Sequence, residues 1–305
     1  MPATEGRGTG DESTAGVPRD PGTRTTGVTA QPAAARPAQV VARPAPLAVK
    51  RFESVWGTVV GFDVRDLAVR GVSAERINDA IDEAVRWLHR VDRVFSTYRA
   101  DSLVTAYRAE PAMAALSERF AAADVDLLAE VIAACERSRT ETGGAFNPWS
   151  VPGGFDPSGF VKGWAVARAA DILRGHDLHF FLVDGSGDMS CAGGEDVGVP
   201  WHIGIRHPDL PDSVMKTVTI ATGATATSGT YERGEHIVNP HSPGDPVAAR
   251  AATVVGPDAA QCEVWATALI VDGPAALPTV AALGADWSAL AVVGDRVLSV
   301  GPAFT

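Results

Sequence analysis

The spacing of apolar residues predicts helices in the first half of the chain and mainly strands in the second half. Apolar side chains recur at helical intervals over residues 77–91, after Ser73, which can cap the first turn. The same spacing predicts helices over 124–135, before the pair Gly143-Gly144, and over about 163–173. Strands are expected over 52–64, 178–183, 201–205, 214–221, 236–238, 253–255, 290–293 and 297–300, with two further helices over 259–271 and 275–283. This order favours the α+β class, with a largely antiparallel sheet core and packed helices.

The first 50 residues differ in composition from the rest of the chain. They are rich in Pro, Ala, Thr, Gly and Arg and show no sustained apolar period. Such a segment buries too little surface to offset its ordering entropy, so we expect a disordered tail over 1–50 and one folded domain over 51–305. The tail contains no apolar run of signal-peptide length and no cysteine for lipid attachment, and no transmembrane segment is expected downstream. These features predict a cytoplasmic protein.

Charge and cysteine content narrow the classes of function. Beyond residue 50, 20 Lys and Arg face 33 Asp and Glu, a net charge of −13, which argues against a nucleic-acid surface. The three cysteines are far apart and form no Cys-x-x-Cys pair, which argues against zinc ribbons and dithiol redox chemistry. Any metal should therefore be a hard ion on oxygen ligands. The candidates are Asp156 and the pair Glu263 and Thr267, which lie four residues apart on one predicted helical face.

Five polar clusters interrupt the predicted elements, and they mark the candidate chemistry. They cover residues 95–102, 143–148, 155–164, 184–188 and 222–241. The last is the densest, since it combines hydroxyl groups, glycines, a tyrosine, an arginine and histidines. Its simplest alternative interpretation is a hydrogen-bonded loop between two strands. The chain shows no dinucleotide fingerprint, no Walker lysine pattern and no Gly-x-Ser-x-Gly elbow.

Lys162 is one of only three lysines and stands between glycines at a predicted helix start. A helix N-terminus with a cation beside it is suited to bind an anion, although a solvated surface lysine is equally compatible with the sequence.

The clusters, in this order, resemble the ApbE family of FAD:protein FMN transferases. The resemblance rests on Trp56-Gly-Thr58, Phe95-Ser-Thr-Tyr-Arg99, Gly144-Ala-Phe-Asn-Pro148, residues 156–163, Gly187-Asp188, Ala226-Thr-Ser-Gly-Thr-Tyr-Glu-Arg233, residues 236–240, and Glu263 with Thr267. It implies an enzyme that needs magnesium and transfers FMN from FAD to a Thr or Ser hydroxyl of an acceptor protein. The products would be a phosphoester-linked flavin and AMP. Acceptor sites of the family resemble Ser/Thr-Gly-Ala-Thr-x-Thr.

The resemblance also implies roles for individual residues. His236 corresponds to the candidate acid/base, with Tyr231 and Arg233 organising the segment around it. The implied magnesium ligands are the Gly159 carbonyl, Glu263 and Thr267. The implied contacts to FAD are Trp56, Tyr98, Ala145, Phe146, Asn147, Asp156, Lys162, Asp188, Ser228 and Ile237.

The sequence departs from the family pattern at several positions and leaves other functions open. The family usually has Asp in place of Glu263 and in place of Asn147. A metal-dependent FAD pyrophosphatase, which gives FMN and AMP, and a non-catalytic FAD-binding protein are the alternatives. Because residues 222–227 themselves read Thr-Gly-Ala-Thr-Ala-Thr, self-modification at Thr227 is a further hypothesis. An ordered segment beside the site is the favoured interpretation of that stretch, since in-line attack needs alignment.

Overall fold

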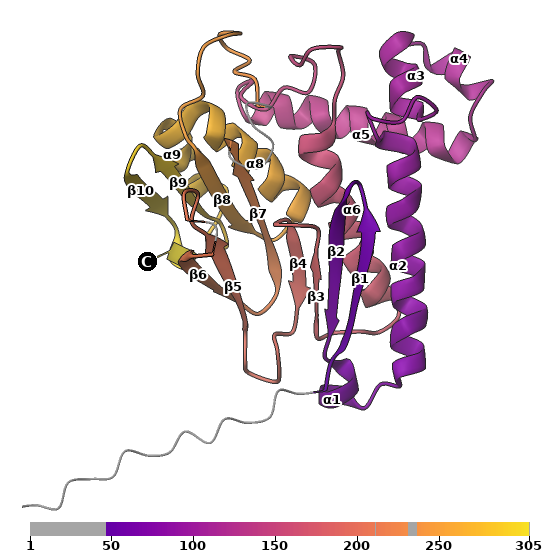
Figure 1. The fold of residues 1–305 in the computed structure, drawn as a ribbon, viewed down its shortest axis with the longest axis vertical. Helices are drawn as coiled ribbons and strands as arrows, with labels where there is room; N and C mark the ends of the chain where they lie inside the picture. Colours follow the sequence, from indigo (N-terminus) through magenta and orange to yellow (C-terminus); the bar gives the residue numbers. More distant parts are fainter. Residues whose placement is uncertain (1–46, 211, 231–236, 305) are drawn as a thin grey trace, which may run out of the picture. The chain divides into compact units, whose positions relative to one another are not determined.

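A computed structural model describes residues 47–210, 212–230 and 237–304, and its centre is an antiparallel sheet (Figure 1). The sheet has eight strands in the order β1-β2-β3-β4-β7-β8-β9-β10, and every pair in it is antiparallel. These strands are β1 (Val49–Val55), β2 (Thr58–Val64), β3 (Phe181–Asp184), β4 (Met189–Ala192), β7 (Gly223–Gly229), β8 (Ala251–Gly256), β9 (Ser288–Val293) and β10 (Arg296–Val300). The α+β prediction with an antiparallel core is therefore confirmed.

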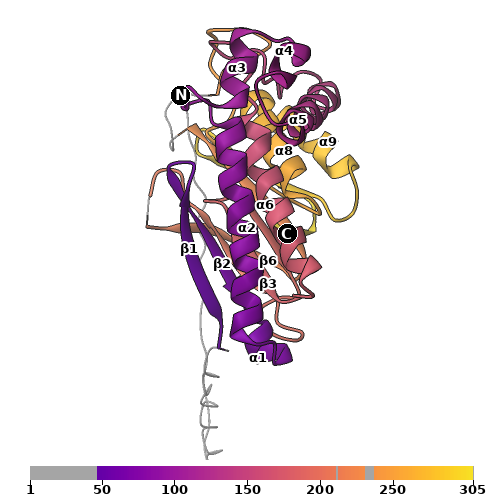
Figure 2. The same cartoon turned by 90° about the vertical axis from the view of Figure 1, so that its right-hand side faces the viewer.

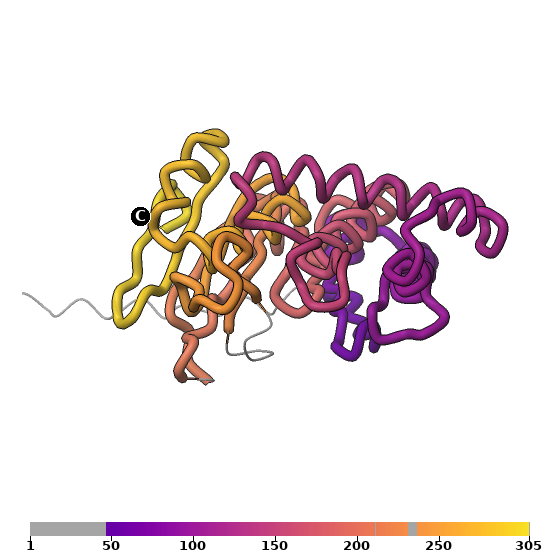
Figure 3. Tube along the Cα trace, turned by 90° about the horizontal axis from the view of Figure 1, so that it is seen from above, coloured from indigo at the N-terminus to yellow at the C-terminus, as the bar shows by residue number. Residues whose placement is uncertain are grey.

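The two faces of the sheet are covered differently. Helices α2, α6 and α8 pack on one face, while a separate ribbon of β5 (Trp201–Arg206) and β6 (Val214–Ile220) covers part of the other (Figures 1 and 2). Helix α5 runs across the row of helices at one end (Figures 1 and 3). The helices are α1 (Asp66–Arg70), α2 (Ala74–Phe95), α3 (Leu103–Ala109), α4 (Met113–Ser117), α5 (Ala122–Glu141), α6 (Ser158–Gly175), α8 (Ala259–Asp272) and α9 (Leu277–Ala282), with short 3₁₀ turns at Gly273–Ala276 and Pro302–Phe304.

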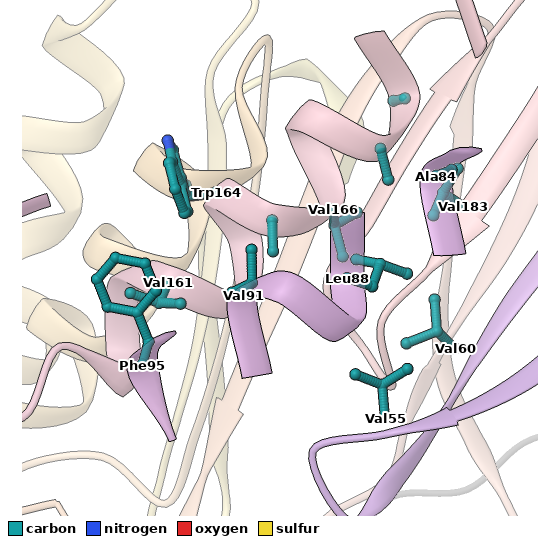
Figure 4. Packing of buried hydrophobic residues seen from close by; sticks show 14 of the residues in the cluster. Val55, Val60, Ala84, Leu88, Val91, Phe95, Val161, Trp164, Val166 and Val183 are labelled. Atoms are coloured by element: carbon teal, nitrogen blue, oxygen red, sulfur yellow. The ribbon is translucent and has the colours of Figure 1, made fainter. Parts of the chain in front are cut away.

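The predicted amphipathic helix over 77–91 is α2, and its apolar face lies against α6 and the first strands (Figure 4). Leu88 and Val91 are completely buried there. Each buried side chain of this size contributes about 1.5–3 kcal/mol relative to an exposed one. The Ser73 hydroxyl accepts a hydrogen bond from the Arg76 N–H at 3.3 Å, so the predicted cap is confirmed.

Helix α8 approaches strands β7 and β8 through small side chains. Ala224 and Ala226 of β7 and Ala252 of β8 are buried against it.

The stretch Ala259–Ala282 is long and apolar enough to cross a membrane by composition, contrary to the expectation of no transmembrane segment. In its most apolar window, 61% of the stretch is buried inside the protein.

Several boundaries differ from the sequence-based predictions for identifiable reasons. The run 52–64 is a hairpin, in which Trp56 and Gly57 form a two-residue turn with φ values of 57° and 72°. Trp56 is apolar and continues the hydrophobic pattern of a strand, and a bulky residue is rare at a positive φ. The pattern therefore predicted one continuous strand rather than a turn. Helix α6 begins at Ser158, earlier than expected, and so Lys162 lies inside the helix rather than at its start.

Other predictions missed whole elements. The Thr-rich stretch 223–229, interpreted as a loop or ordered segment, is the central strand β7. The short strand β4 and helices α3 and α4 were not predicted, because they are too brief to show a period. Ile237 and Val238 lie outside any strand, contrary to the strand expected there. Strand β1 includes Lys50, the last residue of the predicted tail, and the domain boundary itself stays a prediction.

Candidate active site

Contacts between distant segments bring the polar clusters together at one end of the sheet. The Thr58 hydroxyl, beside the β1–β2 turn, contacts the Ser186 hydroxyl in the β3–β4 turn at 2.5 Å. On the helical side, the Ser228 hydroxyl at the end of β7 lies 3.5 Å from the Thr267 hydroxyl on α8. A methyl group placed on Gly159 of α6 would lie 3.5 Å from that same Thr267 oxygen.

A buried charge cluster occupies the centre of this region. The Asp188 side chain is completely inaccessible, and its Oδ2 lies 3.0 Å from the Lys162 Nζ. Neither Asp188 oxygen accepts a hydrogen bond of ordinary geometry from the described residues, so the ion pair with Lys162 is what compensates its charge. The Lys162 side chain is 22% exposed and can therefore reach a bound anion, whereas Asp188 can act on a ligand only through Lys162.

Glu263, the third charged group of this cluster, is 5% exposed. Its Oε2 accepts a hydrogen bond from the Gly163 N–H on α6 at 2.8 Å. Burial, and then the neighbouring Asp188 carboxylate, raise the pKa of Glu263 well above its ordinary value. The raised pKa favours the protonated form of Glu263, and a cation bound beside its carboxyl group would favour the charged form instead.

Close packing of α6 on α8 positions Glu263 and Thr267. A methyl group on Gly163 would lie 2.4 Å from the Ala259 carbonyl oxygen, so only glycine fits at this crossing. Gly163 is thus a site residue that the sequence analysis missed. The available signal was its spacing of four from Gly159, which places both glycines on one face of α6.

The donor atoms near Gly159 fit a hard cation such as magnesium. The Glu263 carboxylate, the Thr267 hydroxyl and the Gly159 carbonyl would supply oxygen ligands, the type that Mg²⁺ takes. Within the described ranges no group of three or more His, Cys, Asp or Glu side chains could hold a metal ion. A site with a single carboxylate matches the habit of Mg²⁺, which retains waters and takes ligand phosphates.

The residues that the resemblance assigned to the flavin differ widely in exposure. Tyr98, just beyond α2, is 90% exposed, whereas the Ala145 and Phe146 side chains are buried. The Asn147 Oδ1 accepts a hydrogen bond from the Trp149 N–H at 3.1 Å, and the Asp156 Oδ1 accepts one from the Ser158 N–H at 3.0 Å. These two side chains therefore fix the turn that leads into α6.

Trp56 and Ile237 are partly buried and pack against two different hydrophobic clusters. The candidate acid/base and the two residues expected to organise its segment lie outside the described residues. They are His236, Tyr231 and Arg233.

The hydroxyl of Thr227 faces away from the charge cluster. Thr227 and Ser228 are neighbours on β7, and side chains of successive strand residues point to opposite faces of the sheet. The Thr227 Oγ1 lies 2.9 Å from the Thr253 Oγ1 of β8, whereas Ser228 lies near Thr267. This placement agrees with the favoured interpretation of an ordered segment rather than a modification site.

Comparison with known proteins identifies relatives for part of this chain. Residues 152–290 match the ApbE family. Over 130 residues the chain is 28% identical to the FAD:protein FMN transferase of Escherichia coli K12, a match that covers 39% of this chain and 37% of that protein. Over 129 residues it is 32% identical to the FAD:protein FMN transferase of Vibrio cholerae, covering 39% and 38%. The chain thus matches little more than a third of the length of these curated relatives.

Solved structures extend the likeness to most of the fold. The flavin transferase ApbE from Vibrio cholerae superposes with a TM-score of 0.68 at 19% identity, covering 85% of this chain and 98% of that one. The apo form of the Pseudomonas stutzeri flavinyl transferase ApbE gives 0.66 at 20% identity, covering 83% and 94%. The segment that matches the ApbE family thus holds Asp188, Lys162, Glu263 and Thr267, and the chain has the fold of the solved ApbE flavin transferases.

Proposed function

We propose that this protein is a FAD:protein FMN transferase, which moves FMN from FAD to a Ser or Thr hydroxyl of an acceptor protein and releases AMP. The observation that carries the proposal is the buried cluster of Asp188, Lys162 and Glu263 beside Gly159 and Thr267. It supplies one fixed cation for a phosphate and a set of oxygen donors for a divalent ion, which are the parts that phosphoryl transfer needs. All of these residues fall in the segment that matches the ApbE family.

In the proposed reaction, the acceptor oxygen forms a bond to the phosphorus of the FMN half as the bridging P–O bond of the pyrophosphate breaks. The hydroxyl proton leaves the acceptor, and AMP departs with the bridging oxygen. Lys162, held by Asp188, would bind a phosphate oxygen and orient the pyrophosphate. Burial of the cluster excludes water, which strengthens each of these charge interactions.

Glu263, Thr267 and the Gly159 carbonyl would hold the proposed magnesium ion. When bound, such an ion neutralises the charge of a pyrophosphate. The Gly163 N–H restrains the Glu263 carboxylate, because the 2.8 Å hydrogen bond ties it to α6. Tyr98, with 90% of its surface exposed, would offer a free aromatic face to a planar ring. His236 is proposed as the group that accepts the hydroxyl proton, on the family resemblance alone.

The test is mass spectrometry of an acceptor peptide after incubation with the protein, FAD and magnesium. The peptide would contain Ser-Gly-Ala-Thr-Ala-Thr, and the proposal expects a mass gain of one FMN together with one AMP released per peptide. Free FMN and AMP without a modified peptide would instead identify a pyrophosphatase. FAD binding without turnover, with or without magnesium, would identify a binding protein.

A further inference from the structure

A second cleft lies on the face of the sheet opposite the charge cluster. It has a volume of about 290 Å³ and lies between the sheet and the β5–β6 ribbon. The sheet contributes Met189 of β4, Thr225 and Thr227 of β7 and Thr253 of β8, and the ribbon contributes Ile203–Arg206 of β5 and Val218 of β6. Pockets for drug-sized ligands and cofactors occupy about 300–1,000 Å³, so this cleft is too small for a second FAD molecule.

The cleft follows the edge of β5 as well as its inner face. Successive strand residues point to opposite faces, yet four consecutive residues of β5 line the cleft. Within the described part of the chain, β5 pairs with β6 alone. The backbone groups along residues 203–205 on the side away from β6 can therefore receive an added strand.

The lining combines three threonines with apolar side chains and one charged residue, Arg206, and it suits a segment with small apolar and hydroxyl-bearing side chains. Thr225 and Thr253 are 3% and 2% exposed, so their hydroxyls are held within the protein wall. Thr227 and Thr253 share one hydrogen bond at 2.9 Å, and each hydroxyl has further capacity as a donor or an acceptor. The small volume excludes large side chains next to these threonines.

The cleft and the charge cluster share two structural elements. The β3–β4 turn lines the cleft with Ser186 and Gly187 and is followed directly by Asp188, which pairs with Lys162. The turn is fixed, because the Gly187 N–H donates to Asp184 Oδ1 at 3.0 Å and the Ser186 hydroxyl donates to the Val59 carbonyl at 3.0 Å. On β7, Thr227 lines the cleft while the next residue, Ser228, lies near Thr267.

We propose that this cleft binds the acceptor protein, as an extended segment of small and hydroxyl-bearing residues added to the edge of β5. The segment would lie beside Thr225 and Thr253 and pass the β3–β4 turn toward the charge cluster. This inference rests on the proposed transferase function, since it assigns the acceptor side of that reaction. It gives the acceptor and FAD separate surfaces of the protein, on either side of β7.

The first test measures flavin transfer by the full chain to the Ser-Gly-Ala-Thr-Ala-Thr peptide as the peptide concentration varies. Thr225→Val and the double variant Thr225→Val/Thr253→Val remove hydroxyls with little change in volume. The proposal expects the KM for the peptide to rise about tenfold in the double variant, the effect of two lost hydrogen bonds of ordinary strength, with kcat and the affinity for FAD unchanged. The matched control is Thr219→Val, an exposed threonine of β6 outside the cleft, which should leave KM unchanged.

An unchanged peptide KM in the double variant, or a weakened affinity for FAD, would overturn the assignment of the cleft. The second test uses the unaltered protein and the same peptide with its last Thr replaced by Ala, so that no transfer occurs. Binding should slow amide hydrogen exchange at residues 201–206, and exchange unaltered at saturating peptide would also overturn the proposal. If the unaltered protein transfers no flavin, the proposed function fails, and the exchange measurement still decides whether the cleft binds the peptide.

Discussion

The two faces of strand β7 differ in the side chains that they present and in how closely other elements approach them. On the helical face Ala224 and Ala226 are buried, and α8 packs directly on them. On the other face Thr225 and Thr227 meet the β5–β6 ribbon across a cleft of about 290 Å³. One strand therefore supports both a closely packed layer and an open one.

This difference shows that the size of the residues in each layer decides how firmly the neighbouring polar side chains are held. The alanines and Gly163 let α6, α8 and the sheet approach closely, which fixes Glu263 and Thr267 with little freedom. A fixed charge cluster excludes water and suits electrostatic work on a small, defined group. A looser, hydroxyl-lined surface is better suited to a polypeptide segment, which can adjust to it.

The largest expected loss of transfer activity follows a substitution of Glu263, on the side of the sheet that α8 covers. The substitution Glu263→Gln keeps the shape of the side chain and an acceptor for the Gly163 N–H but removes the charge. We expect transfer activity to fall at least about a hundredfold, because the ligand charge for the proposed cation is lost. Calorimetric titration with MgCl₂ should show weakened binding, while circular dichroism stays unchanged.

The control for Glu263→Gln is Glu130→Gln, since Glu130 is in a half-exposed ion pair with Arg168 and its Oε1 also accepts a hydrogen bond from the Trp164 indole N–H. Exposed pairs contribute about 0–1 kcal/mol, so this variant should retain activity. Full activity of Glu263→Gln at limiting magnesium would contradict the assignment of this residue.

A smaller effect, on stability rather than on activity, is expected where α6 crosses α8. Gly163→Ala places a methyl group against the Ala259 backbone, whereas Gly175→Ala, in the same helix, meets nothing within 4 Å. Overpacking against backbone should lower the free energy of unfolding by about 1–3 kcal/mol for Gly163→Ala. Gly175→Ala should cause no loss, since alanine is the better helix former. Thermal unfolding of the two variants would test this, and equal melting temperatures would show that the crossing is loose.

Substitutions on the face of β7 that lines the cleft should lower the free energy of unfolding less than substitutions where α6 crosses α8. Thr227→Val and Thr253→Val each remove one partner of the hydroxyl pair, whose oxygens are 2.9 Å apart. Each single change should cost about 1 kcal/mol in unfolding free energy, and the double change less than the sum, because it leaves no lone partner. Urea unfolding of the four proteins measures this coupling. A strictly additive double variant would show that the hydroxyls do not interact.

The protein is not expected to attach flavin covalently to itself. Thr227 is held in β7 with its hydroxyl on the face away from Ser228 and Thr267, so it cannot align with a phosphate bound at the charge cluster. After acid precipitation the flavin should stay in the supernatant. Flavin that remains in the pellet, and is lost in Thr227→Ala, would refute this prediction.

The contrast between faces also explains which predictions succeeded. Helix α2 was predicted well, because its apolar residues recur over many turns and Ser73 caps it. Strand β7 was missed, because Ala marks the apolar face of a strand much less clearly than Val or Ile does, and because glycines stand at both ends of the stretch. The α6 boundary was placed late, since Pro157 and Gly159 look like turn residues when read locally.

The sequence by itself determined the α+β class, the helix–strand order of the long elements and the set of residue types that could bind a nucleotide and a hard cation. Those properties depend on local spacing and on side-chain chemistry, which a single sequence displays. Only the tertiary structure decided that Asp188 is buried under Lys162, that Gly163 binds Glu263, and that Thr225 and Ser228 lie on opposite faces of one strand. These relations join residues up to 100 positions apart, and they depend on how closely helices and strands can pack, which no local pattern records.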